Sequence, residues 1–448
     1  MFKELPDCYY ETTPRLICPE NPTPKHILYL SNLDDQKFLR FSIKYLYVYK
    51  KSIPVNDLKS SLSKVLSYYY PLAGRLRISE ENEDKLEVDC NGEGALFAEA
   101  FMSITVDEFM QVSKWPNMSW RKKLLCRVDA QSFLGIPPLV IQITNLSCGG
   151  MILCISINHC ICDAIGTSQF LHAWAHLQTK PTVDLSVLPF HSRHVLEPRD
   201  PPQTTFSHPE FTNTTPDLDL SLTLQSQPLV PSCLTFTPSH ILRLKRLCVP
   251  SLKCTSFEAL ASHVWRCWIK ALNPHSSLKI KLLFSANIRN SIEPKLPKGY
   301  YGNGFVLGCA ETTVTELVNS NMHHGVKLVQ NAKATLTDDY VKSMVDFLEE
   351  NRVKPDLSST LVISPWSKLG LEDLDFGEGK PLQMGPLASE IYCLFLPVVG
   401  DLHAVKVLVS VPEKIIGKFE HHMINDLYEE DGDELIKDGL ELEEKEQL

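Results

Sequence analysis

A chain of 448 residues is longer than one hydrophobic core usually supports, so the length predicts two domains. The composition, with 44% apolar and 22% charged residues, is that of an ordinary globular protein. The formal net charge of -10 is concentrated at the end of the chain, where residues 429–448 hold ten acidic side chains and two lysines. No segment is basic enough to favour nucleic-acid binding, and the acidic tail is predicted to be solvated and poorly ordered.

The first ten residues carry three charged side chains where a secretory signal would need an apolar core. No run approaches the roughly 18 apolar residues of a membrane span. Fourteen cysteines are scattered through the chain without a CxxC pair, and several lie inside apolar runs, at Cys154, Cys309 and Cys393. This pattern argues against a zinc site and favours reduced, mostly buried thiols. We therefore expect a cytoplasmic protein without a transmembrane segment.

The first predicted elements follow one another as strand, helix and strand. Alternating aromatic and β-branched residues predict a strand from Phe41 to Ser52. The segment VNDLKSSLSKVLSYYY has apolar residues at helical spacing, and Asn56 or Asp57 is the expected N-cap. Two more strands are expected at PLAGRLRI and KLEVDCNGEG.

Two adjacent strands joined by a turn at Gly149 and Gly150 are predicted by PPLVIQITNL and GGMILCISIN. The segment GTSQFLHAWAHL predicts a helix after them. Residues 181–232 are rich in Pro, Thr, Ser and Asp and show no sustained period, which indicates a crossover between two domains.

The second half again mixes helices and strands. Helices are expected at SHILRLKRL, at TSFEALASHVWRCWIKAL, around Glu316 to Leu336 and from Asp339 to Glu350. Strands are expected at KIKLLFSANIRN, STLVIS, EIYCLFLPVV and AVKVLVSVP. This order predicts an α/β protein with a first domain at residues 1–180, the crossover, a second domain at 233–428 and the acidic tail.

The segment MILCISINHCICDAIGTSQF holds the residues best suited to chemistry. An apolar strand runs into His159, Asp163 follows four residues later, and Gly166 opens a helix. A histidine at such a turn projects its ring away from the core and, with a pKa near neutrality, can take a proton from a hydroxyl. The spacing alone does not decide, because His422 and Asp426 repeat it in a polar helical stretch. A histidine that ends a core strand can also serve only as a hydrogen-bonded structural residue.

Six segments together resemble a known family. HCICDAIG resembles the HxxxDG motif of the BAHD acyltransferases of plants, and DFGEG at Asp375 to Gly379 resembles their DFGWG motif. YYPLAGRLR, SFEALASHVWR, the NIR of Asn287 to Arg289 and LPKGYYGN stand in family-like order. The resemblance covers nearly the whole chain apart from the acidic tail. The sequence departs from the motifs at Ala164, where the family usually has Gly, and at Glu378, where it usually has Trp.

The resemblance implies two domains of chloramphenicol-acetyltransferase-like fold, with mixed sheets, flanking helices and an active-site channel between them. It implies that His159 lies in this channel as the general base, removes the proton of an acceptor hydroxyl and lets the oxygen attack the thioester of acyl-CoA. No covalent acyl-enzyme is needed in this sequential mechanism. Acyl-CoA is expected as co-substrate beside a small-molecule alcohol, with no cofactor and no metal, and the protein is expected to be a monomer.

The same resemblance assigns supporting roles to both motifs. Asp163 is expected to pair with Arg289 and to hold the catalytic loop rather than to take a proton. Asp375 is a second candidate catalytic carboxylate, but we expect it to shape a tight bend together with Gly377 and Gly379.

Glu378 is the departure that affects the second motif most. A glutamate in place of an indole needs solvent or a cationic partner, for which Lys380 is a nearby candidate. We expect the change to alter local packing rather than to abolish activity.

Four further residues are candidates for contacts with the substrates, and for Ser364 and Trp366 the resemblance implies this role. Ser364 in VISPW is expected to donate to the developing oxyanion, and Trp366 either walls the acyl pocket or packs in the core. Lys253 and Ser256 are expected to meet the phosphates of CoA.

The leading hypothesis is transfer of an acyl group from CoA to the hydroxyl of a phenylpropanoid or fatty alcohol, with acetyl, benzoyl, hydroxycinnamoyl and longer donors all open. A polyamine acceptor is less expected, because it requires added acidic residues in the pocket. The alternative is a family member that has lost catalysis and acts as an accessory protein, for example of fatty-acid elongation. Ala164 and Glu378 favour this alternative, whereas the intact His159, Asp163 and Asp375 argue against it. A hydrolase is disfavoured because no GxSxG elbow occurs.

Overall fold

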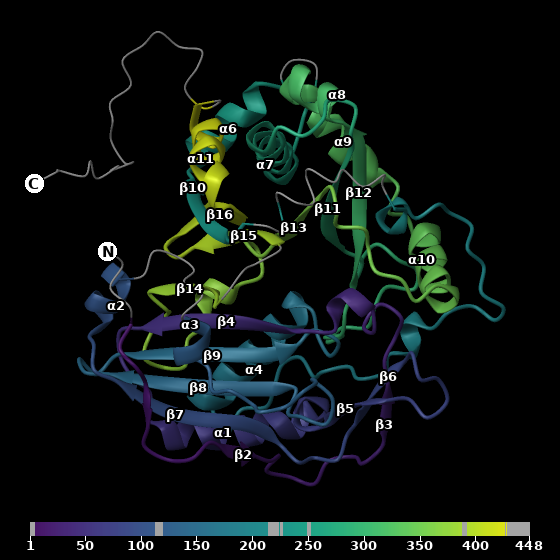
Figure 1. The fold of residues 1–448 in the computed structure, drawn as a ribbon. Coiled ribbons are helices and arrows are strands. Elements are labelled where there is room, and N and C mark those ends of the chain that lie inside the picture. The colour runs from purple at the N-terminus through teal and green to yellow at the C-terminus, as the bar shows by residue number, and fades with distance from the viewer. Residues whose placement is uncertain are drawn as a thin grey trace, which may run out of the picture.

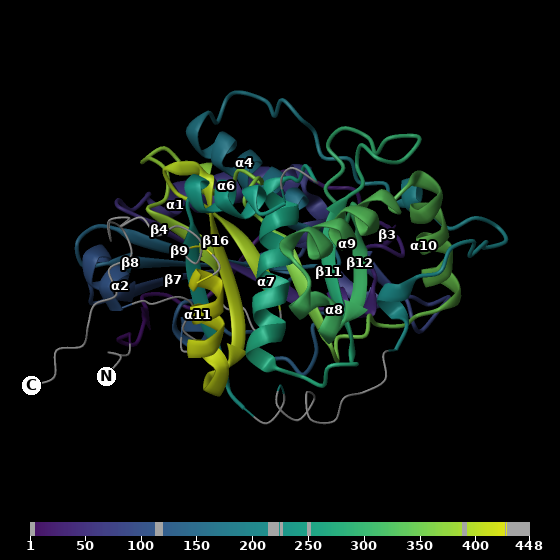
Figure 2. The same ribbon diagram turned by 90° about the horizontal axis from the view of Figure 1, so that it is seen from above.

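The computed structural model describes residues 5–112, 120–213, 224, 227–248, 252–387, 392–425 and 427. Two halves lie one above the other, each built on a β-sheet with helices packed against it (Figure 1). Viewed from above, helices of the second half cover the sheet beneath them (Figure 2). The predicted α/β class with mixed sheets and flanking helices is confirmed. None of the described helices combines the length and hydrophobicity needed to cross a membrane.

The sheet of the first half is mixed. Its strands are β1 (Tyr9–Tyr10), β2 (Arg15–Ile17), β4 (Ser42–Tyr49), β7 (Ala95–Met102), β8 (Leu139–Leu146), β9 (Met151–Asn158) and β14 (Gln383–Pro386). Among the described residues they lie in the order β1, β7, β8, β9, β4 and β14, and β2 also pairs with β7. Among these described strands, β7 and β8 form the one parallel pair. A smaller sheet orders β3 (Ile27–Tyr29), β6 (Leu86–Asp89) and β5 (Arg75–Ile78).

The hairpin predicted around Gly149 and Gly150 is confirmed as β8 and β9. Both strands are buried over nearly their whole length, because helices cover one face of the sheet and a second apolar layer covers the other. Gly149 has a φ of 83°, a conformation that glycine adopts without strain. The hairpin therefore directs β9 through the core and ends it at Asn158, immediately before His159.

The described helices of the first half are α1 (Val55–Tyr68), α2 (Val106–Val112), α3 (Trp120–Lys123) and α4 (Ala164–Thr179). Helix α1 buries the apolar face that includes Leu58 and Leu62. The predicted N-cap at Asn56 or Asp57 is wrong, because the helix begins directly after Pro54. Asp57 lies in the first helical turn instead, where a carboxylate still interacts favourably with the positive end of the helix dipole.

The sheet of the second half consists of β10 (Leu229–Phe236), β16 (Asp401–Pro412), β15 (Tyr392–Val398), β13 (Thr360–Pro365), β11 (Lys279–Asn287) and β12 (Phe305–Thr313), in this spatial order. The described helices around it are α6 (Pro238–Arg246), α7 (Ser256–Leu272), α8 (Val314–Asn319), α9 (Met322–Ala334), α10 (Asp338–Glu350) and α11 (Ile416–Asn425). The helix predicted around Glu316 to Leu336 is two helices, α8 and α9, separated at Ser320. His422 lies on α11, whereas Asp426 lies outside the described residues.

The two faces of the second sheet have different neighbours. Phe284 and Phe395 belong to the core formed with α7 and the other helices. Val362 belongs to a separate small apolar cluster, which includes Phe305 and Tyr392. Alternation along the strands thus gives this sheet a second apolar face, away from its helices.

Seven of the described strands were not predicted from the sequence: β1, β2, β3, β7, β10, β12 and β14. β7 and β12 contain Glu or Gly within their runs, which weakens the alternating pattern. β14 comes from the last quarter of the chain, yet it pairs with β4 of the first sheet. The two halves are therefore joined by a shared sheet as well as by the crossover.

The crossover is fastened to the second half by polar contacts. Its described part contains the short 3-10 turns η3 (His194–Leu196) and η4 (Pro209–Phe211) and the start of β10. Arg199 donates from Nε to Oδ2 of the buried Asp346 on α10 at 2.6 Å. Residues 214–223 of the crossover and the acidic tail lie outside the described residues.

Candidate active site

His159 lies between the two halves of the molecule. It directly follows β9, and its backbone N–H donates to the carbonyl of Phe41 at 2.8 Å. The imidazole ring contacts Phe41 of the first half, with ring centroids 5.5 Å apart, and Phe305 of β12 at 5.9 Å. Phe41 in turn stacks on Tyr392 at 6.1 Å. The ring is therefore held among aromatic side chains from both halves of the molecule.

The two ring nitrogens of His159 have different surroundings. Nδ1 is buried and has no hydrogen-bond partner among the described residues. Nε2, in contrast, is not one of the buried side-chain atoms that lack a partner. Burial lowers the pKa of His159 below its ordinary value, although hydrogen bonding and the charges of Asp163 and Asp34 act in the opposite direction. The ring is therefore neutral at physiological pH, as a general base must be.

Asp163 is fully occupied by hydrogen bonds. It caps α4, where Oδ1 accepts from the backbone N–H of Gly166 at 2.8 Å. Arg289 donates to both carboxylate oxygens at 2.9 Å, and the backbone N–H of Gly304 donates to Oδ2 at 3.0 Å. The predicted pairing of Asp163 with Arg289 is thus confirmed. A carboxylate that accepts four hydrogen bonds is suited to holding the loop, not to accepting a proton.

Gly166 is required by a close backbone contact. A Cβ at this position would lie 1.8 Å from the carbonyl oxygen of Tyr301. The first turn of α4 therefore packs directly on the 300–304 segment, which also supplies Gly304 to Asp163. Ala164, the departure from the family motif, is the first residue of α4 and is half-buried.

Gly166→Ala is expected to lower the free energy of unfolding by about 3 kcal/mol, the upper end of the usual range for overpacking, because the backbone itself must move. Activity should fall with it, since the moved turn carries Asp163. Gly417→Ala is the matched control, because a Cβ there meets nothing within 4 Å in helix α11. Thermal unfolding of the three proteins compares the effects, and equal melting temperatures for the two variants would contradict the predicted contact.

The structure adds residues to this site that the sequence did not single out. Asn303 donates from Nδ2 to the main-chain carbonyl of His159 at 2.8 Å. Arg193, from the crossover, donates from Nη2 to the carbonyl of Ile161 at 2.9 Å and lies 3.7 Å from the buried carboxylate of Asp34. Asn303 stands in the LPKGYYGN segment that carried part of the resemblance, whereas no sequence pattern marked Asp34 or Arg193.

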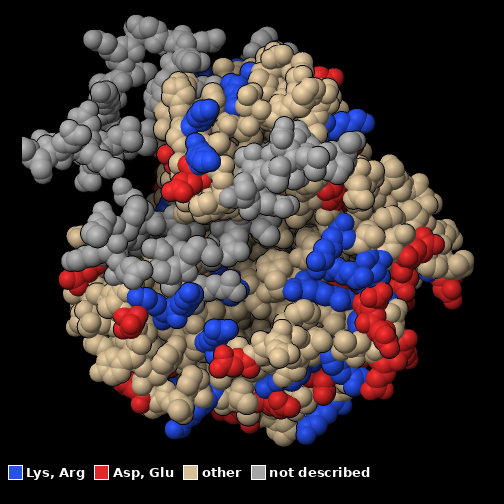
Figure 3. All heavy atoms as spheres, in the orientation of Figure 1, with Lys and Arg blue, Asp and Glu red and all other residues tan. Residues whose placement is uncertain are grey.

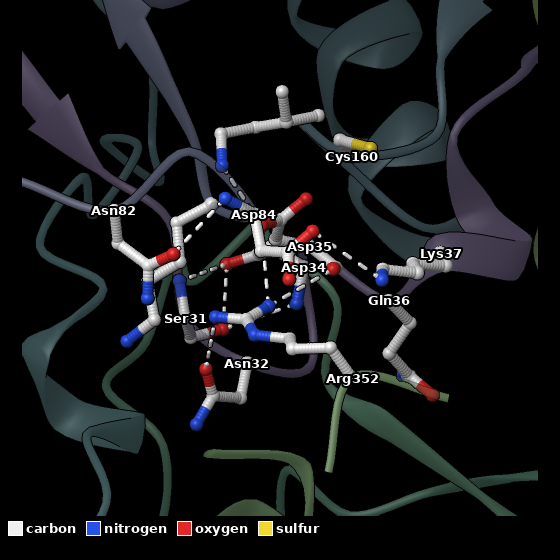
Figure 4. Close-up of polar contacts among 12 residues, drawn as sticks. Ser31, Asn32, Asp34, Asp35, Gln36, Lys37, Asn82, Asp84, Cys160 and Arg352 are labelled. Carbon is white, nitrogen blue, oxygen red and sulfur yellow. Dashed lines mark hydrogen bonds and ion pairs between the residues drawn. The ribbon is translucent and has the colours of Figure 1, made fainter. Parts of the chain in front are cut away.

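A polar cluster joins the two halves beside this loop (Figure 4). Arg352, which follows α10, donates to Oδ2 of Asp35 at 3.2 Å and to Oδ1 of Asn32 at 3.1 Å. Burial raises the pKa of Asp35, while Arg40 and Arg352 oppose this effect. Cys160, next to His159 in sequence, donates from Sγ to Leu39 at 3.5 Å. The cluster therefore fixes the 31–40 segment, against which the catalytic loop rests.

The DFGEG segment forms a tight loop on the surface. The exposed Asp375 accepts from the backbone N–H groups of Gly377 at 2.7 Å and Gly379 at 3.0 Å with its Oδ1. Both glycines have positive φ, 110° and 100°, so the bend depends on them. Phe376 anchors the loop by packing on Trp174 of α4 at 4.9 Å. The arrangement supports the expected role of Asp375 in shaping the bend.

The cationic partner expected for Glu378 is a different lysine. Glu378 pairs with Lys51 at 3.2 Å, whereas Lys380 pairs with Asp373 at 2.7 Å. The prediction that Lys380 pairs with Glu378 is therefore wrong. Although the two residues are close in sequence, their side chains contact different partners. Both pairs are largely exposed, so each contributes little to stability.

Ser364 and Trp366 have different environments. Ser364 lies on β13 two residues after Val362, so both side chains project from the same face of the sheet, the face that carries Phe305. The Ser364 hydroxyl has no hydrogen-bond partner among the described residues. Trp366 is 4% exposed and stacks on Tyr45 of β4 at 5.0 Å, which places it in the core where the two halves meet. Its role in an acyl pocket stays a prediction.

Ser256 is the first residue of α7, Lys253 lies three residues before it, and both are exposed. Among the described residues no hydrogen bond or ion pair joins either side chain to His159 or its neighbours, so their role toward CoA also stays a prediction. A hollow opens between the two halves on the face shown in Figure 3, and Lys and Arg side chains gather beside it. Within the described part of the chain, no group of three or more His, Cys, Asp or Glu side chains is placed to hold a metal ion.

Solved structures share this fold. Vinorine synthase superposes with a TM-score of 0.71 at 20% identity and covers 92% of this chain and 96% of its own. F. graminearum TRI101 complexed with coenzyme A and deoxynivalenol superposes with a TM-score of 0.73 at 15% identity, covering 88% and 97%. At these identities the likeness concerns the fold alone.

Curated relatives are closer in sequence. An omega-hydroxypalmitate O-feruloyl transferase of Arabidopsis thaliana is 36% identical over 428 residues, covering 93% of this chain and 92% of that protein. A fatty alcohol:caffeoyl-CoA acyltransferase of the same plant is 36% identical, covering 91% and 96%. A benzyl alcohol O-benzoyltransferase of Petunia hybrida is 35% identical, covering 83% and 82%. The model of the Transferase family matches residues 11–426. This chain therefore belongs to that family, the BAHD acyltransferases whose motifs its sequence resembles.

Proposed function

We propose that this chain is an acyl-CoA-dependent O-acyltransferase in which His159 is the general base. The observation that carries the proposal is the environment of the His159 ring, which lies between aromatic residues of both halves with its pKa lowered by burial. Asp163 supports it, since its carboxylate is occupied by Arg289 and two backbone N–H groups and leaves the proton transfer to the histidine.

The reaction follows from the neutral ring. Nε2 of His159 takes the proton of the acceptor hydroxyl, and the oxygen attacks the thioester carbon of acyl-CoA. The tetrahedral intermediate then collapses, an ester forms, and the CoA sulfur leaves and takes the proton back from the imidazolium. We assign the Ser364 hydroxyl to the developing oxyanion and Lys253 and Ser256 to the CoA phosphates. No cysteine is needed as a nucleophile.

The relatives narrow the substrates we propose. Two of them are named for a feruloyl or caffeoyl donor and for a fatty alcohol or a hydroxylated fatty acid as acceptor. We infer a hydroxycinnamoyl-CoA donor and a long-chain aliphatic alcohol as acceptor. The apolar cluster of Leu283, Leu307 and Val362 on the sheet face that carries Phe305 supports an apolar substrate.

We also propose that the protein is a monomer and that it is located in the cytoplasm. None of the fourteen cysteines forms a disulfide, not even the buried near neighbours Cys160 and Cys162, which supports a reducing compartment. Chromatography with light scattering gives the mass in solution.

The test is release of CoA thiol from feruloyl-, caffeoyl-, benzoyl- and acetyl-CoA, each with hexadecanol, benzyl alcohol or spermidine. We expect release that depends on both substrates and is fastest with a hydroxycinnamoyl donor and hexadecanol. Fastest release with spermidine would contradict the alcohol preference. No release with any pair, from protein that binds acyl-CoA, would favour the non-catalytic accessory protein instead.

A further inference from the structure

The orientation of the Asn303 side chain is fixed by its partners. Nδ2 donates to Oδ1 of Asp34 at 3.0 Å and to the main-chain carbonyl of His159 at 2.8 Å. The backbone N–H of Asn303 donates to the same Asp34 oxygen at 2.7 Å. Neither a carboxylate nor a carbonyl can donate, so the nitrogen of the amide faces both of them and the oxygen faces the other way.

The amide oxygen of Asn303 lacks a donor. Asn303 is completely buried, and its Oδ1 has no hydrogen-bond partner among the described residues. Nδ1 of His159 is buried and unpartnered in the same way. The Asn303 side chain is close enough to the ring to raise the pKa of His159 by hydrogen bonding, against the larger effect of burial. The two buried atoms complement each other, because Oδ1 of Asn303 is an acceptor and Nδ1 of His159 can carry a proton.

The ring's own main-chain carbonyl favours the same proton position. This carbonyl raises the pKa of His159 by hydrogen bonding, as the Asn303 side chain does, and it is also a hydrogen-bond acceptor. Both groups are acceptors, and because Nδ1 is the buried ring nitrogen we infer that they face it. The tautomer of a neutral histidine is set by the hydrogen bond that the other nitrogen makes. Hydrogen bonds of this kind are often loose in a resting enzyme and tighten with substrate.

Behind Asn303 lies a chain of buried charges. Asp34 is completely buried, and its second oxygen accepts from Ser31 Oγ at 2.7 Å. Arg193, also completely buried, lies 3.7 Å from that oxygen and stacks on Tyr301, with 4.5 Å from the guanidinium carbon to the ring centroid. The crossover and the N-terminal segment thus fix the amide that faces the catalytic ring.

We propose that Asn303 is a positioning residue, which keeps the proton of neutral His159 on Nδ1 and leaves Nε2 free as the base. The effect on turnover rests on the acyltransferase function proposed above, whereas the tautomer is a property of the resting protein. The charged groups that act on the ring are Asp163 and Asp34, with Arg289 and Arg193 paired to them.

The direct test is long-range proton–nitrogen NMR of protein labelled with nitrogen-15 at histidine, with His159 assigned by comparison with His159→Gln. Above the pKa, we expect a protonated Nδ1 and a bare Nε2 in the wild type. Protonated Nε2, or an average of both forms, would overturn the proposal even if the enzyme is active. In Asn303→Leu we expect the average to appear.

Turnover gives the second readout. Asn303→Leu is expected to lower kcat roughly 100-fold, a smaller loss than the roughly 10⁴-fold effect of a wrong tautomer in serine proteases. The KM for acyl-CoA should change little, and the acid limb of the pH profile should move to lower pH. Asn331→Leu, the same substitution at an exposed position of helix α9, is the control and should stay near wild type. Equal losses in both variants without a shift of the acid limb would show a merely structural role.

Different results would contradict the proposed acyltransferase function and the proposed role of Asn303. If no donor and acceptor pair is turned over by the wild type, the proposed function fails, and the NMR measurement alone still decides the tautomer. If turnover is normal but Nε2 carries the proton, the role of Asn303 fails and the acyltransferase stands.

Discussion

Replacing His159 with Ala is expected to lower kcat/KM roughly 10²- to 10⁴-fold, the usual contribution of a general base. The loss should fall on kcat, because the ring acts on the proton that moves during reaction, whereas we assigned CoA binding to Lys253 and Ser256. Folding should be little affected, since the surrounding loop is held through Asp163 and Asn303 rather than through the ring. CoA release and thermal unfolding, measured side by side, separate the two effects.

The pH dependence of the wild type gives an independent check on this base. Burial lowers the pKa of His159 below the ordinary 6.5, and only the neutral ring accepts a proton. The acid limb of kcat/KM should therefore have its midpoint below pH 6.5. His159→Ala should lose this acid limb. An acid limb above pH 6.5, or one that persists in the variant, would assign the titration to another group.

Replacing Arg289 with Ala is expected to cost about 3–5 kcal/mol of stability, because it leaves the carboxylate of Asp163 buried without its cation. The Asp163 side chain is 7% exposed, and Arg289 also donates from Nη2 to the carbonyl of Gly302 at 2.8 Å. Loss of these contacts frees the loop on which His159 lies, so activity should fall by roughly 100-fold, as for other misplaced catalytic groups.

Three companion variants sharpen this prediction. Arg289→Lys should recover only part of the loss, because a lysine cannot form the two parallel hydrogen bonds to Asp163. Adding Asp163→Asn to Arg289→Ala should restore stability, since no unpaired buried charge is left. Arg246→Ala, at an exposed position of α6, is the control and should be close to neutral. Arg289→Ala with the stability of this control would mean that the pair does not hold the loop.

The elements that the sequence predicted well are those with strong local patterns. The hairpin of β8 and β9 has two continuous apolar runs joined by glycines, so its form follows from neighbouring residues alone. β14 has only the four residues Gln383–Pro386, with a glycine and a proline among them, and pairs with β4 across more than 300 positions. Such a pairing depends on tertiary contacts that no local pattern records.

In the site, too, residues that belong to a motif could be predicted, whereas residues brought together by tertiary structure could not. His159, Asp163 and Arg289 were identified because motifs carry them, and their pairing followed from the family resemblance. Asp34 and Arg193 meet at the catalytic loop from distant segments, and each alone reads as an ordinary charged residue. The partner of Glu378 was missed for the same reason, since Lys51 lies 327 positions away and Lys380 only two. Sequence proximity is a weak guide to which charges pair on a folded surface.

The most direct test of the central claim is the first turnover. Feruloyl-CoA is mixed rapidly with an excess of enzyme, with and without hexadecanol, and free CoA thiol is followed in time. If His159 activates the alcohol for direct attack, CoA appears rapidly only when hexadecanol is present, and His159→Ala removes this phase. A rapid release of one equivalent of CoA without any alcohol would reveal a covalent acyl-enzyme and contradict the mechanism.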